Sequence, residues 1–243
     1  MSYGTLFLLP APLGALDDIA CLPMPLLETT RKLSYFVVEH SKSARQLLKA
    51  IGTDTPLQQL QLSELNEHSK PEVIKDLIQP LIDGKDVGLL SEAGCPGVAD
   101  PGAPLVAACH RHGIRVVPYV GPSSILLALM ASGASGQRFT FHGYLPADEA
   151  GRVQAIRELE QTSKDRNESQ IFIETPYRNN ALLGSLLSTL KPDTWLSIAT
   201  DLTTEHEQIV ANEARLWPKA LPELNKRPTV FIVQAPAKKP NTK

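Results

Sequence analysis

Short apolar runs alternate with amphipathic segments along the first half of the chain. The run Thr5–Leu9 is stopped by two prolines and a glycine, which is typical of a buried strand that enters a loop. Further strands are predicted at residues 35–38, 57–62, 87–90 and 114–119. Apolar residues at helical spacing predict helices at 26–32, 42–51, 72–82, 103–112 and 125–131. Ser41 is the expected cap of the second helix, and Gly52 its stop. Strands that alternate with helices predict a mainly parallel sheet.

The second half shows the same mixture after a short flexible segment. Residues 132–136 are small, flexible and polar, so we expect a domain boundary there. Strands are then predicted at 139–145, 171–174, 195–202, 207–211 and 229–233, with helices at 149–161 and 177–190 and a loop at 163–169. The sequence therefore predicts an α/β protein of two α/β domains, residues 1–132 and 137–235. We expect the tail at 236–243 to be disordered.

Several predicted strands end in loops that could bind a ligand. These loops are residues 10–14, 39–40, 91–102, 121–124 and 144–146. The longest, residues 91–102, holds three glycines and two prolines, which shape a backbone and let a ligand approach it. Ligands of open α/β sheets bind at the carboxyl ends of strands, where this loop lies. An ordinary connection between strand and helix explains the same composition.

Composition and charge exclude several classes of function. The 243 residues carry a formal net charge of −2, so the chain as a whole has no electrostatic footprint for nucleic acid, although a local patch remains compatible. Three cysteines without paired spacing favour a reducing, cytoplasmic compartment. No apolar run reaches membrane length, and no signal peptide begins the chain, so we expect no membrane association. The dinucleotide fingerprint, the P-loop and metal-ligand spacings are absent, which leaves no predicted metal site.

A few residues could take part in chemistry. Glu174 ends a strand close to Arg178, which fits either a site pair or a structural ion pair. Asp100 fits a turn residue that binds loop amides better than it fits a proton acceptor. Cys95 has only acidic neighbours, so we interpret it as a packing residue, not as a nucleophile.

Taken together, the loops resemble the tetrapyrrole (corrin/porphyrin) methylase superfamily. The resemblance runs from Leu6 to about Leu216, and its most specific part is residues 91–102 followed at the expected distance by Gly-Pro-Ser-Ser at 121–124. Within the superfamily, the chain is most similar to the branch of ribosomal small subunit methyltransferase I, which methylates a ribose 2′-hydroxyl. That branch typically has S-D-A-G-T-P-G-I-S-D-P-G where this chain has residues 91–102.

The resemblance implies S-adenosylmethionine as methyl donor, with S-adenosylhomocysteine as product, bound in a cleft between two α/β domains. It also implies a homodimer, with RNA or a ribosomal subunit as acceptor. The donor contacts implied by the family's motifs are Pro10, Gly94, Cys95, Pro96, Val98, Ser123, Ser124, Tyr144, Leu145, Ile173 and Leu202. A proton acceptor for an alcohol substrate would come from Glu39, Asp100, Glu174 or His206, which the sequence does not rank.

The chain departs from the ribosomal branch at four places, one of which is Pro176-Tyr177-Arg178 where the branch has Pro-His-Arg. Ala15 replaces the usual asparagine after Gly14, residues 39–42 read Glu-His-Ser-Lys in place of E-D-T-R, and the branch's basic C-terminal module has no counterpart in these residues. These departures keep two alternatives open. The acceptor could be a tetrapyrrole or another small molecule, or the chain could bind the donor without catalysis.

Overall fold

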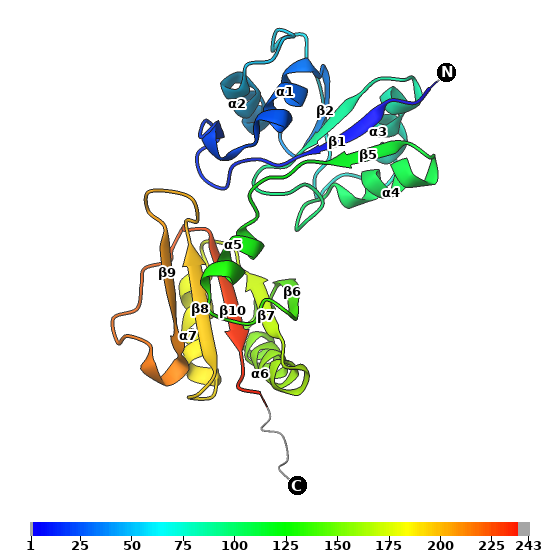
Figure 1. Cartoon of the computed structure of the whole chain (residues 1–243). Helices are drawn as coiled ribbons and strands as arrows, with labels where there is room; N and C mark the ends of the chain where they lie inside the picture. Colours follow the sequence, from blue (N-terminus) through cyan, green and yellow to red (C-terminus); the bar gives the residue numbers. More distant parts are fainter. Residues whose placement is uncertain (1, 238–243) are drawn as a thin grey trace. The chain divides into compact units, whose positions relative to one another are not determined.

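The computed structural model describes residues 2–237 and divides into two compact units, Met1–Ser123 and Ser124–Lys243, each built on its own five-stranded sheet (Figure 1). The division precedes helix α5 (Ser124–Ala131), whereas the sequence placed the boundary after it. Helix α5 packs against two strands of the second unit, and the Trp195 indole donates a 2.8 Å hydrogen bond to the Ser132 carbonyl just after it. Residues 238–243 of the predicted tail lie outside the described residues.

The first unit contains a fully parallel sheet with the order β3-β2-β4-β1-β5. Its strands are β1 (Thr5–Leu9), β2 (Tyr35–Val38), β3 (Gln61–Glu64), β4 (Val87–Leu90) and β5 (Arg115–Pro118). Its α-helices are α1 (Met24–Lys32), α2 (Ser41–Ile51), α3 (Val73–Ile82) and α4 (Ala103–Arg111), with a short 3-10 turn η1 (Ile19–Cys21) before α1. The prediction of a parallel sheet is confirmed for this unit.

The first unit has three layers, because helices cover both faces of its sheet. Side chains along each strand point alternately to one face and to the other. Leu9, Phe36 and Leu90 point to the side covered by α1 and α2, whereas Leu6 and Leu89 point to the side covered by α3 and α4. Both faces are therefore buried, as in other parallel sheets. At the carboxyl edge of the sheet, the loop after β1 meets the loop after β4.

The second unit has a mixed sheet with the order β6-β7-β10-β8-β9. Its strands are β6 (Phe139–Tyr144), β7 (Ser169–Ile173), β8 (Trp195–Thr200), β9 (Gln208–Glu213) and β10 (Thr229–Gln234). Only β6 and β7 pair in parallel, and the other three pairings are antiparallel. β8 and β9 are joined by a short turn instead of a helix, and such a short connection makes neighbouring strands antiparallel.

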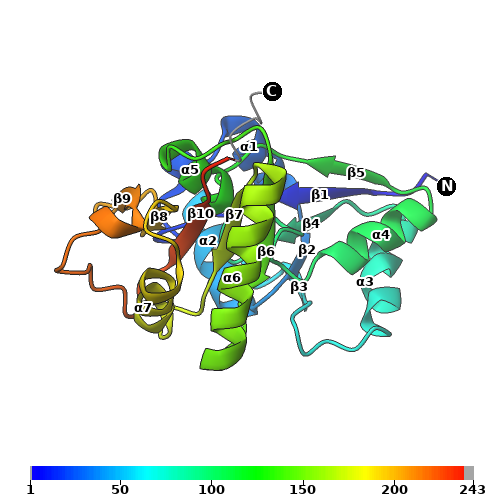
Figure 2. The ribbon, with the colours of Figure 1, turned by 90° about the horizontal axis from the view of Figure 1, so that it is seen from below.

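Two long helices cover one face of the second sheet. They are α6 (Glu149–Arg166) and α7 (Asn179–Thr189), and a 3-10 turn η2 (Ala214–Leu216) follows β9 (Figure 2). Their core includes Phe172 and Phe231, whose rings stack with centroids 5.8 Å apart. This core lies within the second unit.

Three local predictions are wrong. Helix α6 continues to Arg166, into the predicted loop at 163–169, and Asn167 ends it at a φ of +52°. Ser41 does not cap α2; it is the first helical residue, and its amide donates to the Glu64 carboxylate at 2.9 Å. The third strand lies at Gln61–Glu64 and not at 57–62. No helix among residues 2–237 has the length and apolar character to cross a membrane.

Candidate functional site

Three loops of the first unit are locked together where β1, β4 and β5 end. Ala11 and Gly94 exchange two backbone hydrogen bonds of 2.9 and 3.0 Å, which ties the loop after β1 to the loop after β4. Gly94 adopts a φ of +72°, a conformation that glycine tolerates best. The Ser91 hydroxyl donates to the Gly94 carbonyl at 2.6 Å and fixes the same turn. The predicted loops are therefore one assembly.

The loop after β5 joins this assembly by close packing. The Cys95 thiol donates to the Pro122 carbonyl at 3.4 Å. A Cβ atom on Gly121 would lie 2.2 Å from the Cβ atom of Pro10, so only glycine allows this approach. Cys95 thus behaves as a packing residue, and burial raises the pKa of its thiol above the usual range.

Asp100 holds the long loop from within. One of its carboxylate oxygens accepts hydrogen bonds from the Gly97 and Gly102 amides, both at 2.8 Å. Such bonds are the turn role that the sequence favoured for this residue. The loop is consequently fixed before any ligand binds, which lowers the entropic cost of binding.

The predicted donor contacts of the first unit differ in exposure. Pro10, Gly94 and Pro96 are buried, Cys95 and Ser123 are half-buried, and Val98 is exposed. Ser124, the next residue along the chain, is also half-buried. The hydroxyls of Ser123 and Ser124 have no hydrogen-bond partner among residues 2–237, so both remain available to a ligand.

Acidic side chains gather beside the loops at the end of β2. Burial raises the pKa of the Glu39 carboxyl, and the nearby carboxylates of Glu92 and Asp100 raise it further. Glu92 is held by two neighbours: the His40 ring nitrogen Nδ1 lies 3.2 Å from its Oε1, and the Ser43 hydroxyl donates to the same oxygen. The raised pKa makes the Glu39 carboxylate a stronger base than an ordinary glutamate.

Glu174 and Arg178 form a close ion pair in the second unit. The Arg178 guanidinium donates to Glu174 Oε1 at 2.6 Å, and the Thr175 amide donates to the same oxygen at 2.6 Å. The Glu174 side chain is 0% exposed, and its other oxygen has no partner among the described residues. The pair therefore fixes the turn between β7 and α7, as a structural ion pair does.

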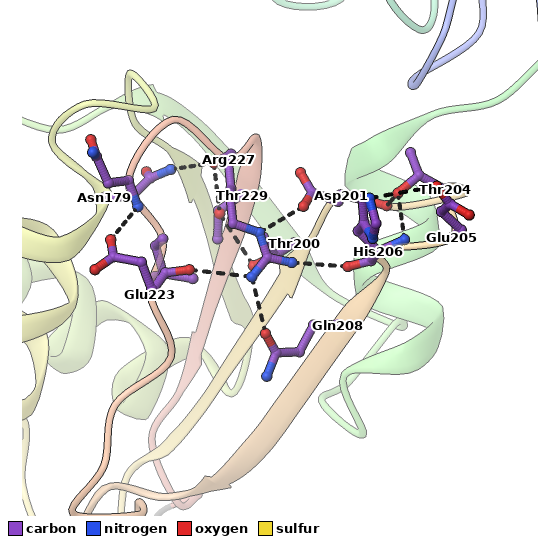
Figure 3. A network of polar contacts seen from close by, with 12 residues as sticks. Asn179, Thr200, Asp201, Thr204, Glu205, His206, Gln208, Glu223, Arg227 and Thr229 are labelled. Atoms are coloured by element: carbon purple, nitrogen blue, oxygen red, sulfur yellow. Dashed lines mark hydrogen bonds and ion pairs between the residues drawn. The ribbon is translucent and has the colours of Figure 1, made fainter.

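A polar network centred on Arg227 holds the loop that carries Leu202 (Figure 3). Arg227 donates to the Asp201 carboxylate at 2.6 Å and to the His206 carbonyl at 2.9 Å. Asp201 and Thr203 adopt φ angles of +48° and +69°, which are costly for residues with a side chain. The network compensates for this strain and gives the loop one conformation.

These features coincide with a known family. The family model of Tetrapyrrole (Corrin/Porphyrin) Methylases matches residues 5–216, which include the three loops of the first unit and the loop that carries Leu202. The chain belongs to the tetrapyrrole methylase family. The predicted family and the predicted α/β fold class are both confirmed.

Named relatives of this methylase share most of its length. Ribosomal RNA small subunit methyltransferase I of Pseudomonas aeruginosa is 34% identical over 212 residues, which cover 86% of this chain and 70% of the relative. The protein of the same name from Escherichia coli O157:H7 is 30% identical over 236 residues, which cover 96% and 78%.

Solved structures confirm the fold of the methylase. The crystal structure of the methyltransferase CobJ matches with a TM-score of 0.61 at 18% identity, covering 97% of this chain and 100% of that chain. Uroporphyrin-III-C-methyltransferase from Thermus thermophilus matches with a TM-score of 0.53 at 18% identity, covering 95% and 92%. The predicted enzyme class, a methyltransferase, is confirmed by the family and the named relatives.

Sequence reasoning missed the residues that hold the methylase's loops in place. Arg227 precedes the last strand as a single arginine in a polar segment, and no local pattern connects it to Asp201. Glu92 was visible as part of the long loop, but its link to Ser43 depends on the fold. In the second unit, Tyr144 is exposed, Ile173 is half-buried, and Leu145 and Leu202 are buried; their donor contacts stay predictions.

Proposed function

We propose that this methyltransferase takes its methyl group from S-adenosylmethionine and that the three loops of the first unit hold the donor. The observation that carries the proposal is the backbone bridge between Ala11 and Gly94, which joins the loops at the carboxyl edge of a parallel sheet. Ligands bind at this edge in open α/β folds. Membership of the methylase family supports the same placement.

The residues at this edge suit the donor's chemistry. S-adenosylmethionine needs hydrogen-bond donors for its carboxylate and polar backbone groups beside an apolar wall for its adenosine. The free hydroxyls of Ser123 and Ser124 supply donors, and the exposed side chain of Val98 supplies apolar surface. The sulfonium, when bound, supplies an activated methyl group, so the protein mainly has to align the acceptor.

We further propose that the acceptor is a ribose 2′-hydroxyl of small-subunit ribosomal RNA. The named relatives, 30% and 34% identical, support this acceptor. The methyl group moves from sulfur to the ribose oxygen, S-adenosylhomocysteine leaves, and the hydroxyl loses its proton. Glu39 is the carboxylate proposed to take up that proton, because its raised pKa increases its basicity.

Calorimetry and a transfer assay test the two parts separately. The full chain should bind S-adenosylmethionine and should transfer a labelled methyl group to undermethylated small ribosomal subunits. A change in the absorbance of a porphyrin precursor on titration, with label in that precursor, would contradict the RNA acceptor. Donor binding with no transfer to any of these acceptors would favour a binding protein without catalysis, and no donor binding at millimolar concentration would contradict the whole proposal.

The expected homodimer and the expected cytoplasmic location stay predictions. Sedimentation velocity of the full chain tests the first, and fractionation of cells that produce the chain tests the second. Either could fail while the proposed chemistry stands.

A further inference from the structure

A groove of about 730 Å³ lies on the first unit, lined by α3, by α4 and by the loop at 65–71 that leads into α3. The two helices lie side by side in both ribbon views (Figures 1 and 2). The groove is separate from the acidic group formed by Glu39 and Glu92, which lines a different, small pocket. None of the groove's lining residues is among the predicted donor contacts.

The floor of the groove is apolar and follows helical rows. Ile74, Ile78 and Ile82 recur every fourth residue along α3, and Pro104 and Ala108 do so along α4. Rows at this spacing form the ridges between which another helix packs. Helix α3 has 10 residues, a length of about 15 Å, so the groove accommodates about three turns of a docked helix.

The rim of the groove carries positive charge at both ends. Lys70 and Lys75 lie near the start of α3, and Arg111 lies at the end of α4. No aspartate or glutamate is among the lining residues, although acidic residues outnumber basic ones in the chain as a whole. Lys70, Lys75 and Arg111 form no ion pair with any of residues 2–237. Their charges are therefore unpaired and spaced along the groove.

We propose that this groove docks an acidic amphipathic helix of a partner protein. An apolar stripe on such a helix would cover the isoleucine row, and its flanking carboxylates would meet Lys70, Lys75 and Arg111, a recognised mode of helix-in-groove binding. Charge complementarity selects an acidic partner over a neutral one. Nucleic acid fits less well, because no phenylalanine, tyrosine or tryptophan lines the groove to stack on bases.

A model peptide tests the proposal on the full chain. The probe is a fluorescein-labelled peptide of about 14 residues, roughly 20 Å as a helix, with leucines along one stripe and glutamates elsewhere. Fluorescence anisotropy should show saturable binding that weakens with salt, and hydrogen exchange should show protection at 65–82 and 101–112. A peptide of the same composition in scrambled order should bind more weakly.

Charge reversal supplies the matched control. The double variant Lys75→Glu/Arg111→Glu should lower the affinity for the acidic peptide by about tenfold or more, because it opposes two carboxylates at close range. Lys49→Glu/Arg115→Glu makes the same change of net charge at exposed residues of the first unit outside the groove, and it should leave the affinity unchanged. Thermal unfolding checks that both double variants are folded.

Four outcomes would overturn the proposal. The first is no binding of the acidic peptide at about 1 mM, which corresponds to a binding free energy of only about 4 kcal/mol. The second is an equal loss of peptide affinity in both double variants. The third is protection from hydrogen exchange outside the groove, and the fourth is equal binding of the scrambled peptide. Loss of RNA binding or of a dimer in the groove variant, without loss of peptide binding, would assign the face to RNA or to a second copy of the chain instead.

Discussion

Replacing Arg227 with methionine should destabilise the second unit and free the loop that carries Leu202. Methionine keeps an apolar stem of similar length but removes the guanidinium that donates to Asp201 at 2.6 Å and to the His206 carbonyl at 2.9 Å (Figure 3). The Asp201 carboxylate then loses its cation while its φ of +48° still needs support from its neighbours.

The magnitude follows from burial. The side chains of Arg227 and Asp201 are 27% and 16% exposed, so the pair is mostly desolvated. A hydrogen bond to a charged group contributes about 1.5–3 kcal/mol, and removing one partner of a fully buried pair costs about 3–5 kcal/mol. We therefore expect Arg227→Met to lower the free energy of unfolding by about 2–4 kcal/mol.

Arg215 provides a matched control within the same unit. Its Nε lies 2.7 Å from Glu213 Oε2, nearly the geometry of the Arg227 pair, but the two side chains are 60% and 33% exposed. Exposed pairs contribute about 0–1 kcal/mol, so Arg215→Met should have a small effect. Comparison of the two variants measures the combined effect of burial and of the further hydrogen bonds that only Arg227 donates.

Urea unfolding followed by tryptophan fluorescence measures the effect. The chain's two tryptophans, Trp195 and Trp217, both lie in the second unit, so the signal reports on that unit. The midpoint and slope together give the free energy of unfolding. The reasoning is refuted if Arg227→Met and Arg215→Met agree within about 0.5 kcal/mol, a difference typical of surface substitutions.

Three further predictions concern the first unit. Gly94→Ala and Gly113→Ala both place a side chain at a positive φ, +72° and +69°, so each should lower the free energy of unfolding by about 1–2 kcal/mol. Only Gly94→Ala should also lower the affinity for S-adenosylmethionine, measured by calorimetry. Equal donor affinity in the two variants would contradict the proposal that the three loops hold the donor. Glu39→Gln should be more stable than the native chain at pH 7–8 in thermal unfolding, because a pKa raised above 4.5 makes the ionised carboxyl costly in the folded state above that pKa. The difference in stability between the two chains should vanish as the pH falls to 4.5. A difference that grows towards acid pH would show that folding lowers the pKa of Glu39. Burial raises the pKa of Cys109 to about 11, so this thiol should react with a disulfide reagent at about pH 8 only after unfolding; rapid labelling of Cys109 in the native chain, located by mass spectrometry, would be the contrary result.

The first unit could be predicted from the sequence because its rules are local. Every strand except β3 contains a short apolar run, the helices carry apolar residues at helical spacing, and glycines such as Gly52 stop helices at a positive φ. The loop at 91–102 was also visible, since glycine and proline mark a shaped backbone. Even the turn role of Asp100 followed from residue type.

The second unit was harder to predict because its decisive contacts join distant residues. Nothing in the run Trp195–Thr200 indicates that β10 will pair with β8 on one side and with β7 on the other. Arg227 reaches Asp201 across 26 positions of the chain, and no local pattern encodes that pair. In the first unit, the cap predicted at Ser41 failed for the same reason. The Ser41 amide donates to the carboxylate of Glu64, which lies 23 positions away, and no local pattern connects the two residues.

The most direct test of the proposed function is the position of a transferred methyl group. The full chain is incubated with methyl-labelled S-adenosylmethionine and undermethylated small ribosomal subunits, and the RNA is then hydrolysed in alkali. A methyl group on the 2′-oxygen blocks cleavage at its own nucleotide, so the account predicts label in alkali-resistant dinucleotides. Label in protein, in a base or in a porphyrin fraction, or no transfer at all, would contradict it.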